Sequence, residues 1–165
     1  MQIEKYKTES TVDNLIYTFE SVGEKVIQKM VIYTKIENPE DIGLTFDSIV
    51  YNLGFGDWNQ ETGDLDDQII SKNGDTEKVL ATVAETVNKF WMLYPNASIF
   101  FIGSVPKGEK PRRTRLYQMK INRYFSKINS LVDIGGYNYE GRKWENFVKN
   151  ENYMAFLISR KKQLF

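Results

Sequence analysis

Apolar and polar residues alternate through the first third of the chain in a manner typical of β-strands. Residues 15–22 and 25–36 are rich in β-branched and aromatic side chains, and Gly23 and Glu24 separate them. This spacing predicts a β-hairpin whose second strand is largely covered. A third strand is expected over residues 46–55, after the turn residues 38–41.

A long acidic loop and an amphipathic helix follow. The loop over residues 58–73 exceeds the usual length of a connection, which predicts that it is functional or mobile. Asp75 suits the N-cap of a helix that begins at Thr76, and Pro95 ends that helix. Its expected buried face, at spacings of three and four residues, consists of Val79, Leu80, Val83, Val87, Phe90, Trp91 and Tyr94.

The second half of the chain continues with strands around one more helix. The apolar run 97–102 predicts a short strand in the middle of a sheet, and residues 103–111 a loop. A helix is expected over residues 112–129. Its apolar face would hold Tyr117, Ile121, Tyr124, Phe125 and Ile128, and a basic stripe would hold Arg112, Lys120, Arg123 and Lys127. Short strands are expected over 131–134 and 153–159, with a loop or short helix over 135–150.

This order predicts one domain, residues 1–165, of α/β or α+β class. The mixed sheet would have about five to six strands in the order β-β-β-α-β-α-β(-β). The same order is that of the ribonuclease H-like fold, in which an antiparallel trio continues into parallel strands through helical crossovers. A sheet with both helices on one face would give the same order of elements, so the two arrangements stay open.

Composition excludes several reaction classes. The chain has 0 cysteine and 0 histidine residues, so a disulfide framework, a Ser-His-Asp triad, a cysteine protease and an ordinary zinc site are all excluded. A bound metal would be a hard cation held by carboxylates. No apolar run has the length of a signal peptide or a membrane span, which predicts a cytoplasmic protein without membrane contact.

A net charge of +0 conceals two clusters of opposite sign. The segment 57–75 carries Asp57, Glu61, Asp64, Asp66, Asp67 and Asp75 against Lys72 alone. The segment 107–127 carries Lys107, Lys110, Arg112, Arg113, Arg115, Lys120, Arg123 and Lys127 against Glu109 alone. Most of these charges are expected to be solvated loop and helix surface.

The arginines at the start of the second helix define the candidate binding site. A helix N-terminus carries a partial positive charge, so Arg113 and Arg115 are unfavourable there without an anion nearby. That anion would be a phosphate, bound by the arginines and the free amides of the helix start, or the carboxylates of Asp57 and Asp75 in a structural ion pair. The candidate ligand-binding residues are Asp57, Asp75, Ser104, Arg113, Arg115 and Tyr117.

Two other functions stay open. A phosphodiesterase with Mg²⁺ or Mn²⁺ would use Asp57, Asp75 and Glu85. A ribonuclease H-like nuclease would instead begin from Glu20 and Glu85, but the strand 97–102 ends without a carboxylate. A protein-interaction module, such as a toxin-antitoxin component, would use aromatic anchors, for which the candidates are Trp58, Tyr137, Tyr139 and Trp144. A neutral chain makes strong nonspecific DNA binding unfavourable, and the tyrosines of the second helix are expected in the core.

Five short segments together resemble an uncharacterised bacterial family, mostly from bacteroidetes, that is labelled a domain of unknown function. They are YNLGFGD at 51–57, NGD at 73–75, VLATV at 79–83, GS at 103–104 and RTRLYQ at 113–118. The resemblance extends from Tyr17 to about Ile158. It implies a small bacterial cytoplasmic protein, and it transfers no catalytic role to any residue.

Overall fold

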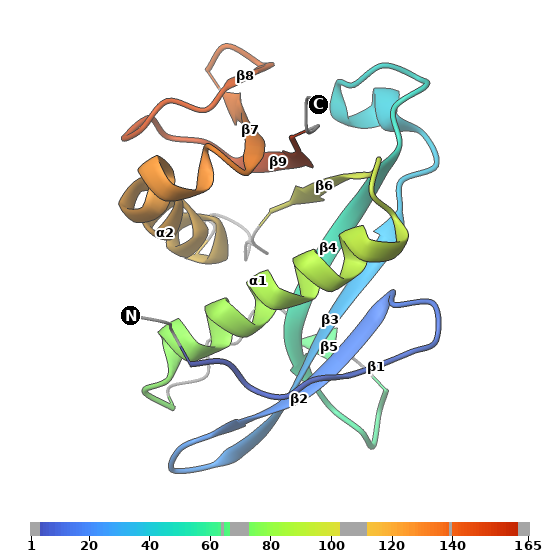
Figure 1. Ribbon diagram of the computed structural model, residues 1–165, viewed down its shortest axis with the longest axis vertical. Coiled ribbons are helices and arrows are strands. Elements are labelled where there is room, and N and C mark those ends of the chain that lie inside the picture. Colours follow the sequence, from blue (N-terminus) through green and yellow to red (C-terminus); the bar gives the residue numbers. More distant parts are fainter. Residues whose placement is uncertain (1–3, 64, 67–72, 103–111, 139, 162–165) are drawn as a thin grey trace. The chain divides into compact units, whose positions relative to one another are not determined.

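The chain folds into two compact units that interleave along the sequence. The computed structural model describes residues 4–63, 65, 66, 73–102, 112–138 and 140–161, and for residues 66 and 112–117 it describes the backbone only (Figure 1). The first unit comprises Met1–Thr34 and Gly54–Pro95, and the second comprises Lys35–Leu53 and Asn96–Phe165. Whether the two behave as one domain, as the length of the chain predicts, stays a prediction.

Strands and two helices make up both units. The strands are β1 (Glu9–Ser10), β2 (Ile16–Val22), β3 (Val26–Lys35), β4 (Val50–Trp58), β5 (Leu65–Asp66), β6 (Ser98–Phe101), β7 (Val132–Asn138), β8 (Lys143–Asn146) and β9 (Ala155–Arg160). The α-helices are α1 (Thr76–Leu93) and α2 (Arg112–Ile128), and a short 3-10 helix, η1, spans Pro39–Ile42. Within the described part of the chain, no helix is long and apolar enough to cross a membrane.

The strands form one mixed sheet in the order β1-β2-β3-β4-β6-β9-β7-β8, and β5 pairs with β4. The class and the mixed sheet are confirmed, with more strands than the five or six expected. The ribonuclease H-like topology is not confirmed. Helix α1 does connect the parallel strands β4 and β6, but β9 runs antiparallel to β6, so the sheet does not continue into further parallel strands there.

The first unit packs α1 against the inward face of β2 and β3 (Figure 1). Alternation places Tyr17, Val31 and Tyr33 inside, and the ring of Tyr33 stacks on Phe90 of α1 with centroids 4.4 Å apart. The helix buries Val79, Thr82, Val83, Thr86, Val87, Phe90 and Trp91. The apolar periodicity therefore predicted this face well, but it did not identify the two buried threonines.

Buried hydroxyl groups in this core differ in how they are satisfied. The hydroxyl of Tyr33 lies 2.9 Å from Oγ1 of Thr86, which in turn donates to the carbonyl oxygen of Val83. Tyr17 is fully buried, and its hydroxyl has no hydrogen-bond partner among the residues that the structure describes. Burial raises the pKa of Tyr17 to about 12, with smaller contributions from Tyr94 and Asp13. A buried hydroxyl without a partner costs free energy of folding.

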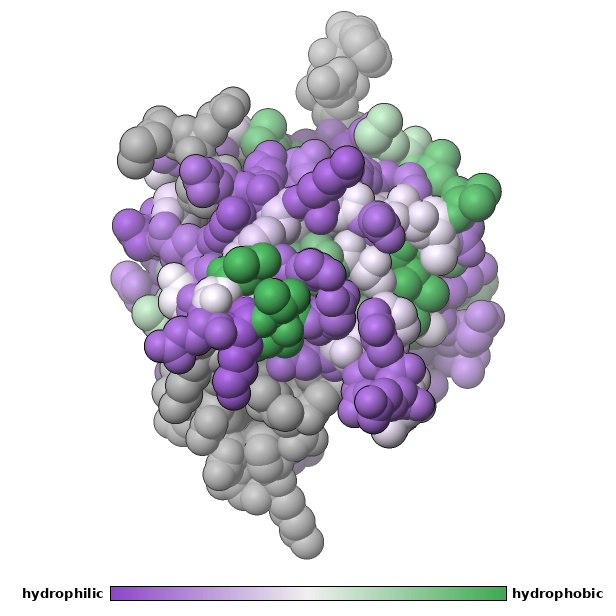
Figure 2. Space-filling view, turned by 90° about the horizontal axis from the view of Figure 1, so that it is seen from below, coloured by the Kyte–Doolittle hydropathy of each residue, from purple (hydrophilic) through white to green (hydrophobic). Residues whose placement is uncertain are grey.

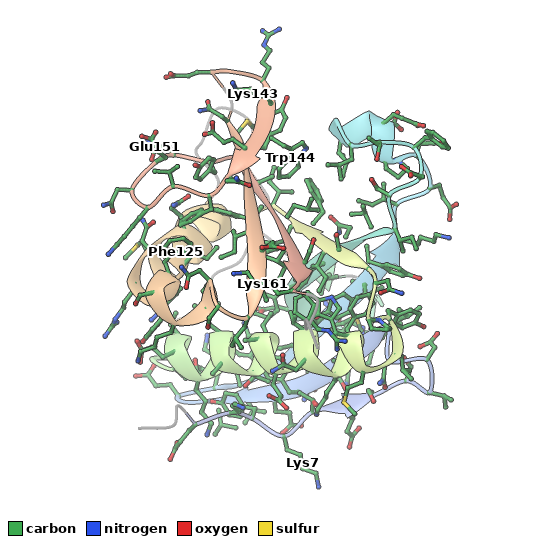
Figure 3. The ribbon with its side chains drawn as sticks, turned by 45° about the horizontal axis from the view of Figure 1, so that its top comes forward. Lys7, Phe125, Lys143, Trp144, Glu151 and Lys161 are labelled. Atoms are coloured by element: carbon green, nitrogen blue, oxygen red, sulfur yellow. The ribbon has the colours of Figure 1, made fainter. Side chains whose placement is uncertain are left out.

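The second unit has its own aromatic core. Strands β6, β9 and β7 contribute Phe101, Phe156 and Ile134, and Phe147 follows β8. Phe125 of α2, labelled in Figure 3, packs on Phe147 with ring centroids 5.1 Å apart. Helix α2 thus turns its apolar face toward this core, as the periodicity of Ile121 and Phe125 predicts.

Several element boundaries differ from those expected. Residues 135–150, expected as a loop or short helix, contain the end of β7 and all of β8, which pair antiparallel from Gly135 to Asn138. Two adjacent glycines and polar side chains concealed this hairpin, since strand propensity is low there. The long acidic loop holds β5, which pairs with the end of β4. The loop expected over residues 103–111 lies outside the described residues.

We expect Gly136→Ala to destabilise the protein strongly. A Cβ atom at Gly136 would lie within 2.6 Å of three ring atoms of Tyr153, a buried residue whose ring packs on Phe147 and Phe156. Overpacking of this kind costs about 1–3 kcal/mol, which urea unfolding would measure. Gly135→Ala is the matched control, because a Cβ there meets only atoms at 3.7 Å or beyond. Equal losses in the two variants would contradict the packing of Tyr153.

We expect Tyr17→Phe to leave the free energy of unfolding unchanged or to raise it by about 1 kcal/mol, since it removes a buried hydroxyl without a partner. The pKa of Tyr17 is raised above that of an unfolded tyrosine because burial disfavours the ionised phenol, so the free energy of unfolding is unaffected by this group below pH 10 and falls as the pH rises from 10 toward 12. Urea unfolding at pH 8 and pH 11 should therefore show a smaller alkaline loss in the variant. Tyr33→Phe is the control and should destabilise, because its hydroxyl has a partner.

Candidate functional site

A buried lysine holds one of the predicted site carboxylates. The alternation of β3 turns Lys29 inward, where its side chain is 2% exposed, and its Nζ forms an ion pair with Oδ1 of Asp57 on β4. The Nζ also lies 5.8 Å from the ring centroid of Phe55. A buried ammonium is costly unless it is paired. Asp57 is therefore committed to a partner inside the first unit.

The second predicted carboxylate, Asp75, lies at the N-cap position of α1 as the sequence predicts, but its side chain makes no capping hydrogen bond. Its Oδ2 instead accepts hydrogen bonds from the hydroxyls of Tyr6, at 2.6 Å, and Ser21, at 2.5 Å. The amide of Asn73 donates to Oγ of Ser21 at 3.1 Å and to the carbonyl oxygen of Lys25 at 2.9 Å. Asn73 thus ties the turn before α1 to the hairpin of β2 and β3.

The segment before β1 covers this network and runs along α1. The amide of Tyr6 donates to Oγ1 of Thr82 at 2.8 Å, and Nζ of Lys78 lies 4.2 Å from the centroid of the Tyr6 ring. Burial, and then the hydrogen bond to Asp75, raise the pKa of Tyr6. Nothing in the sequence pattern around Tyr6 identified it, because a lone tyrosine in a polar segment gives no periodic signal.

The carboxylates proposed for metal binding each have a different partner. Glu85 forms an ion pair with Lys5 at 3.0 Å, and its hydrogen bond from Lys5 is the main cause of its lowered pKa. Glu20 accepts a hydrogen bond from Gln28. Among the described residues, no group of three or more carboxylates is placed to hold a metal ion. The described geometry therefore gives no support to the metal-dependent alternatives.

Helix α2 carries a part of the basic residues of the second unit. Its 17 residues include no aspartate and no glutamate. Three cations surround Tyr124, with Nζ of Lys120 at 5.9 Å, Cζ of Arg123 at 5.4 Å and Nζ of Lys127 at 5.8 Å from the ring centroid. We call Lys120, Arg123, Tyr124 and Lys127 the α2 basic cluster. Tyr124, expected in the core, is half-buried and belongs to this cluster.

The remaining predicted site residues are described only in part. Arg113, Arg115 and Tyr117 lie in the first two turns of α2, where the backbone alone is described. Ser104 lies outside the described residues. Their convergence with Asp57 and Asp75 stays a prediction.

The two units differ sharply in charge. The first contains 7 lysines and no arginine against 13 acidic residues, a net charge of −6, and the second contains 15 basic against 9 acidic residues, a net charge of +6. The neutral total of the chain is the sum of two strongly charged units. The argument from overall neutrality against binding of polyanions therefore does not hold for the second unit alone.

Two of the aromatic residues proposed as interface anchors, Tyr137 and Trp144, pack against each other. Trp144, labelled on β8 in Figure 3, donates from Nε1 to the carbonyl oxygen of Ile42 at 2.6 Å and packs edge-on against Tyr137 and Phe100. Trp58 is half-buried at the end of β4, and Tyr139 lies outside the described residues. These contacts give Trp144 a structural role, and the interaction hypothesis stays a prediction.

Exposed apolar side chains are scattered over both units. On the face drawn in Figure 2 they form small groups between hydrophilic residues. The exposed large hydrophobic residues are Val12, Val22, Val26, Phe46, Ile49, Met92, Leu93, Ile102, Met119, Leu131 and Val148. Scattered apolar residues are normal for a protein surface and do not define an interface.

The geometry defines a mixed α/β protein that carries the α2 basic cluster on its second helix. The chain belongs to a family of unknown function, DUF6934, whose model matches residues 2–161. This match confirms the resemblance to a domain of unknown function. No curated protein and no solved structure matches the chain.

We expect Lys29→Met to lower the free energy of unfolding by about 3 kcal/mol, because it leaves the carboxylate of Asp57 without its partner. The double variant Lys29→Met/Asp57→Leu should recover part of that loss, since it removes both charges. Urea unfolding of the four proteins of this cycle gives the coupling energy, and additive losses would contradict the ion pair. Glu4→Gln is the control: the pair of Glu4 and Lys78, at 3.9 Å, is exposed and should contribute less than about 1 kcal/mol.

Proposed function

We propose that this protein binds a phosphate-bearing anion through helix α2. The observation that carries the proposal is the α2 basic cluster, in which three cations lie within 6 Å of one tyrosine ring on a helix without acidic residues. Lys120, Arg123 and Lys127 follow one another at spacings of three and four residues, so they lie on one side of the helix and concentrate positive charge there. Concentrated positive charge attracts phosphate groups.

The predicted residues at the start of α2 extend this proposal. Arg113 and Arg115 add positive charge where the helix dipole already disfavours it, and a phosphate would be stabilised by the dipole, the free amides and the guanidinium groups together. Ser104 and Tyr117 belong to the same proposed region. Together with the cluster, Arg113 and Tyr117 would extend the proposed anion-binding side of α2 toward the helix start.

The contacts of Asp57 and Asp75 favour a bound ligand, and not these two carboxylates, as the counter-charge of Arg113 and Arg115. Asp57 is paired with Lys29, and Asp75 accepts two hydrogen bonds through a single oxygen. Each carboxylate thus already has a polar partner within the first unit. In our proposal neither of them is the counter-charge of the arginines.

The intracellular setting forms part of this proposal. Phosphate-bearing polyanions are abundant in the bacterial cytoplasm, the compartment and origin that the family resemblance implies. The excess of basic residues in the second unit would attract such ligands over a distance of about 8–10 Å at physiological salt.

The proposal predicts that binding of polyanions depends on the α2 basic cluster. We expect the triple variant Lys120→Gln/Arg123→Gln/Lys127→Gln to lose roughly tenfold or more in affinity for polyphosphate and for a labelled oligonucleotide at about 0.1 M salt. The slope of log affinity against log salt should fall by about one for each phosphate group that the variant no longer neutralises. Fluorescence anisotropy with the oligonucleotide, in competition with polyphosphate, measures both quantities.

The matched control is Lys35→Gln/Arg142→Gln/Lys143→Gln. It removes the same charge from exposed positions of the same unit outside α2. It should change the affinity less than threefold. Equal losses in the two triple variants, or no binding of either probe at low salt, would refute the proposal.

A further inference from the structure

The α2 basic cluster contains an aromatic ring, which simple phosphate binding does not require. Resting on the function proposed above, we infer that the ligand is a single-stranded nucleic acid, with one base stacked on Tyr124 and the flanking phosphates held by Lys120, Arg123 and Lys127.

The position of Tyr124 on the helix places its ring among the cations. Lys120 precedes it by four residues, Lys127 follows it by three and Arg123 is adjacent, so all three side chains reach the same ring. The core side of the helix is supplied by Ile121, which is buried, and by Phe125, which packs on Phe147. Tyr124 is only half-buried. Its ring therefore lies at the border between the core and the solvent.

A ring in this setting suits a nucleobase. Proteins that bind single strands combine cations that follow the sugar-phosphate backbone with aromatic side chains on which bases stack. This stacking adds to the affinity and tolerates any sequence, because every base has a π-face. Lysine and arginine have long flexible stems, so they can leave the ring for a phosphate while a base takes their place. In the free protein the same cations lie close enough to interact with the ring.

The ring also distinguishes this ligand from the alternatives. The bases of a duplex are stacked on one another, and polyphosphate has no bases, so neither ligand gains from Tyr124. Both would bind through charge alone. A preference for unpaired strands is thus the property that the aromatic residue adds to a basic helix.

The test compares ligands and variants by fluorescence anisotropy. The ligands are labelled ten-nucleotide strands of thymidine DNA and of uridine RNA, an abasic strand with the same number of phosphates, a duplex and, as competitor, polyphosphate. The variants are Tyr124→Leu, which keeps an apolar side chain without a ring, and Tyr124→Phe, which keeps the ring and loses the hydroxyl.

We expect Tyr124→Leu to bind the single strands roughly five- to a hundredfold more weakly. Tyr124→Phe should stay within about twofold of the unmodified protein. Binding of polyphosphate and the salt slope should not change in either variant, which shows that the charges are intact. The unmodified protein should bind the abasic strand roughly five- to a hundredfold more weakly than the normal strand, a comparison that does not depend on the folding of any variant.

The outcomes separate this inference from the proposed function. Equal affinity for normal and abasic strands, or for single strand and duplex, overturns the stacking of a base on Tyr124. If the cluster triple variant still loses affinity in that case, anion binding by α2 stands without it. If no polyanion binds the unmodified protein, both proposals fail. A difference between the DNA and RNA strands would identify which strand fits the cluster better.

Discussion

The ion pair between Lys29 and Asp57 is the constraint on which the first unit depends. An ammonium group inside a β-structure requires a partner, because its transfer from water costs several kcal/mol that only pairing offsets. Lys29 follows the inward alternation of β3, and its partner Asp57 lies on the neighbouring strand β4. This pair favours one register of β3 against β4, and it removes Asp57 from any site that needs a free carboxylate.

The same logic extends to the start of α1. Asp75 makes no capping hydrogen bond to the helix and instead accepts hydrogen bonds from the hydroxyls of Tyr6 and Ser21. The start of α1 is therefore held by the segment before β1 and by β2. Three polar groups that are remote in sequence satisfy one another in place of water. The acidic residues that looked like a site are thus largely structural where the chain is described.

Positive charge in the second unit has a different character. The residues of the α2 basic cluster reinforce one another's charge on a helix with no acidic residue. Their common feature is the ring of Tyr124, which all three cations approach. The opposite charge of the first unit conceals this excess of basic residues in the overall composition.

The sequence by itself determined both helices, the β2–β3 hairpin and the central strand β6. It also determined the buried face of α1, which includes Val79 and Phe90. Each of these features follows from the local periodicity of apolar residues. The sequence also located the opposed charges. Only the tertiary structure decided the partners. Lys29 and Asp57 lie 28 residues apart, and Tyr6 and Asp75 lie 69 apart, so no local pattern relates them. Likewise the β7–β8 hairpin depends on pairing across Gly135 and Gly136, whose intrinsic preference for strands is weak. Contacts between residues far apart in sequence thus give Asp57 and Asp75 a structural role, and helix α2 remains the candidate for function.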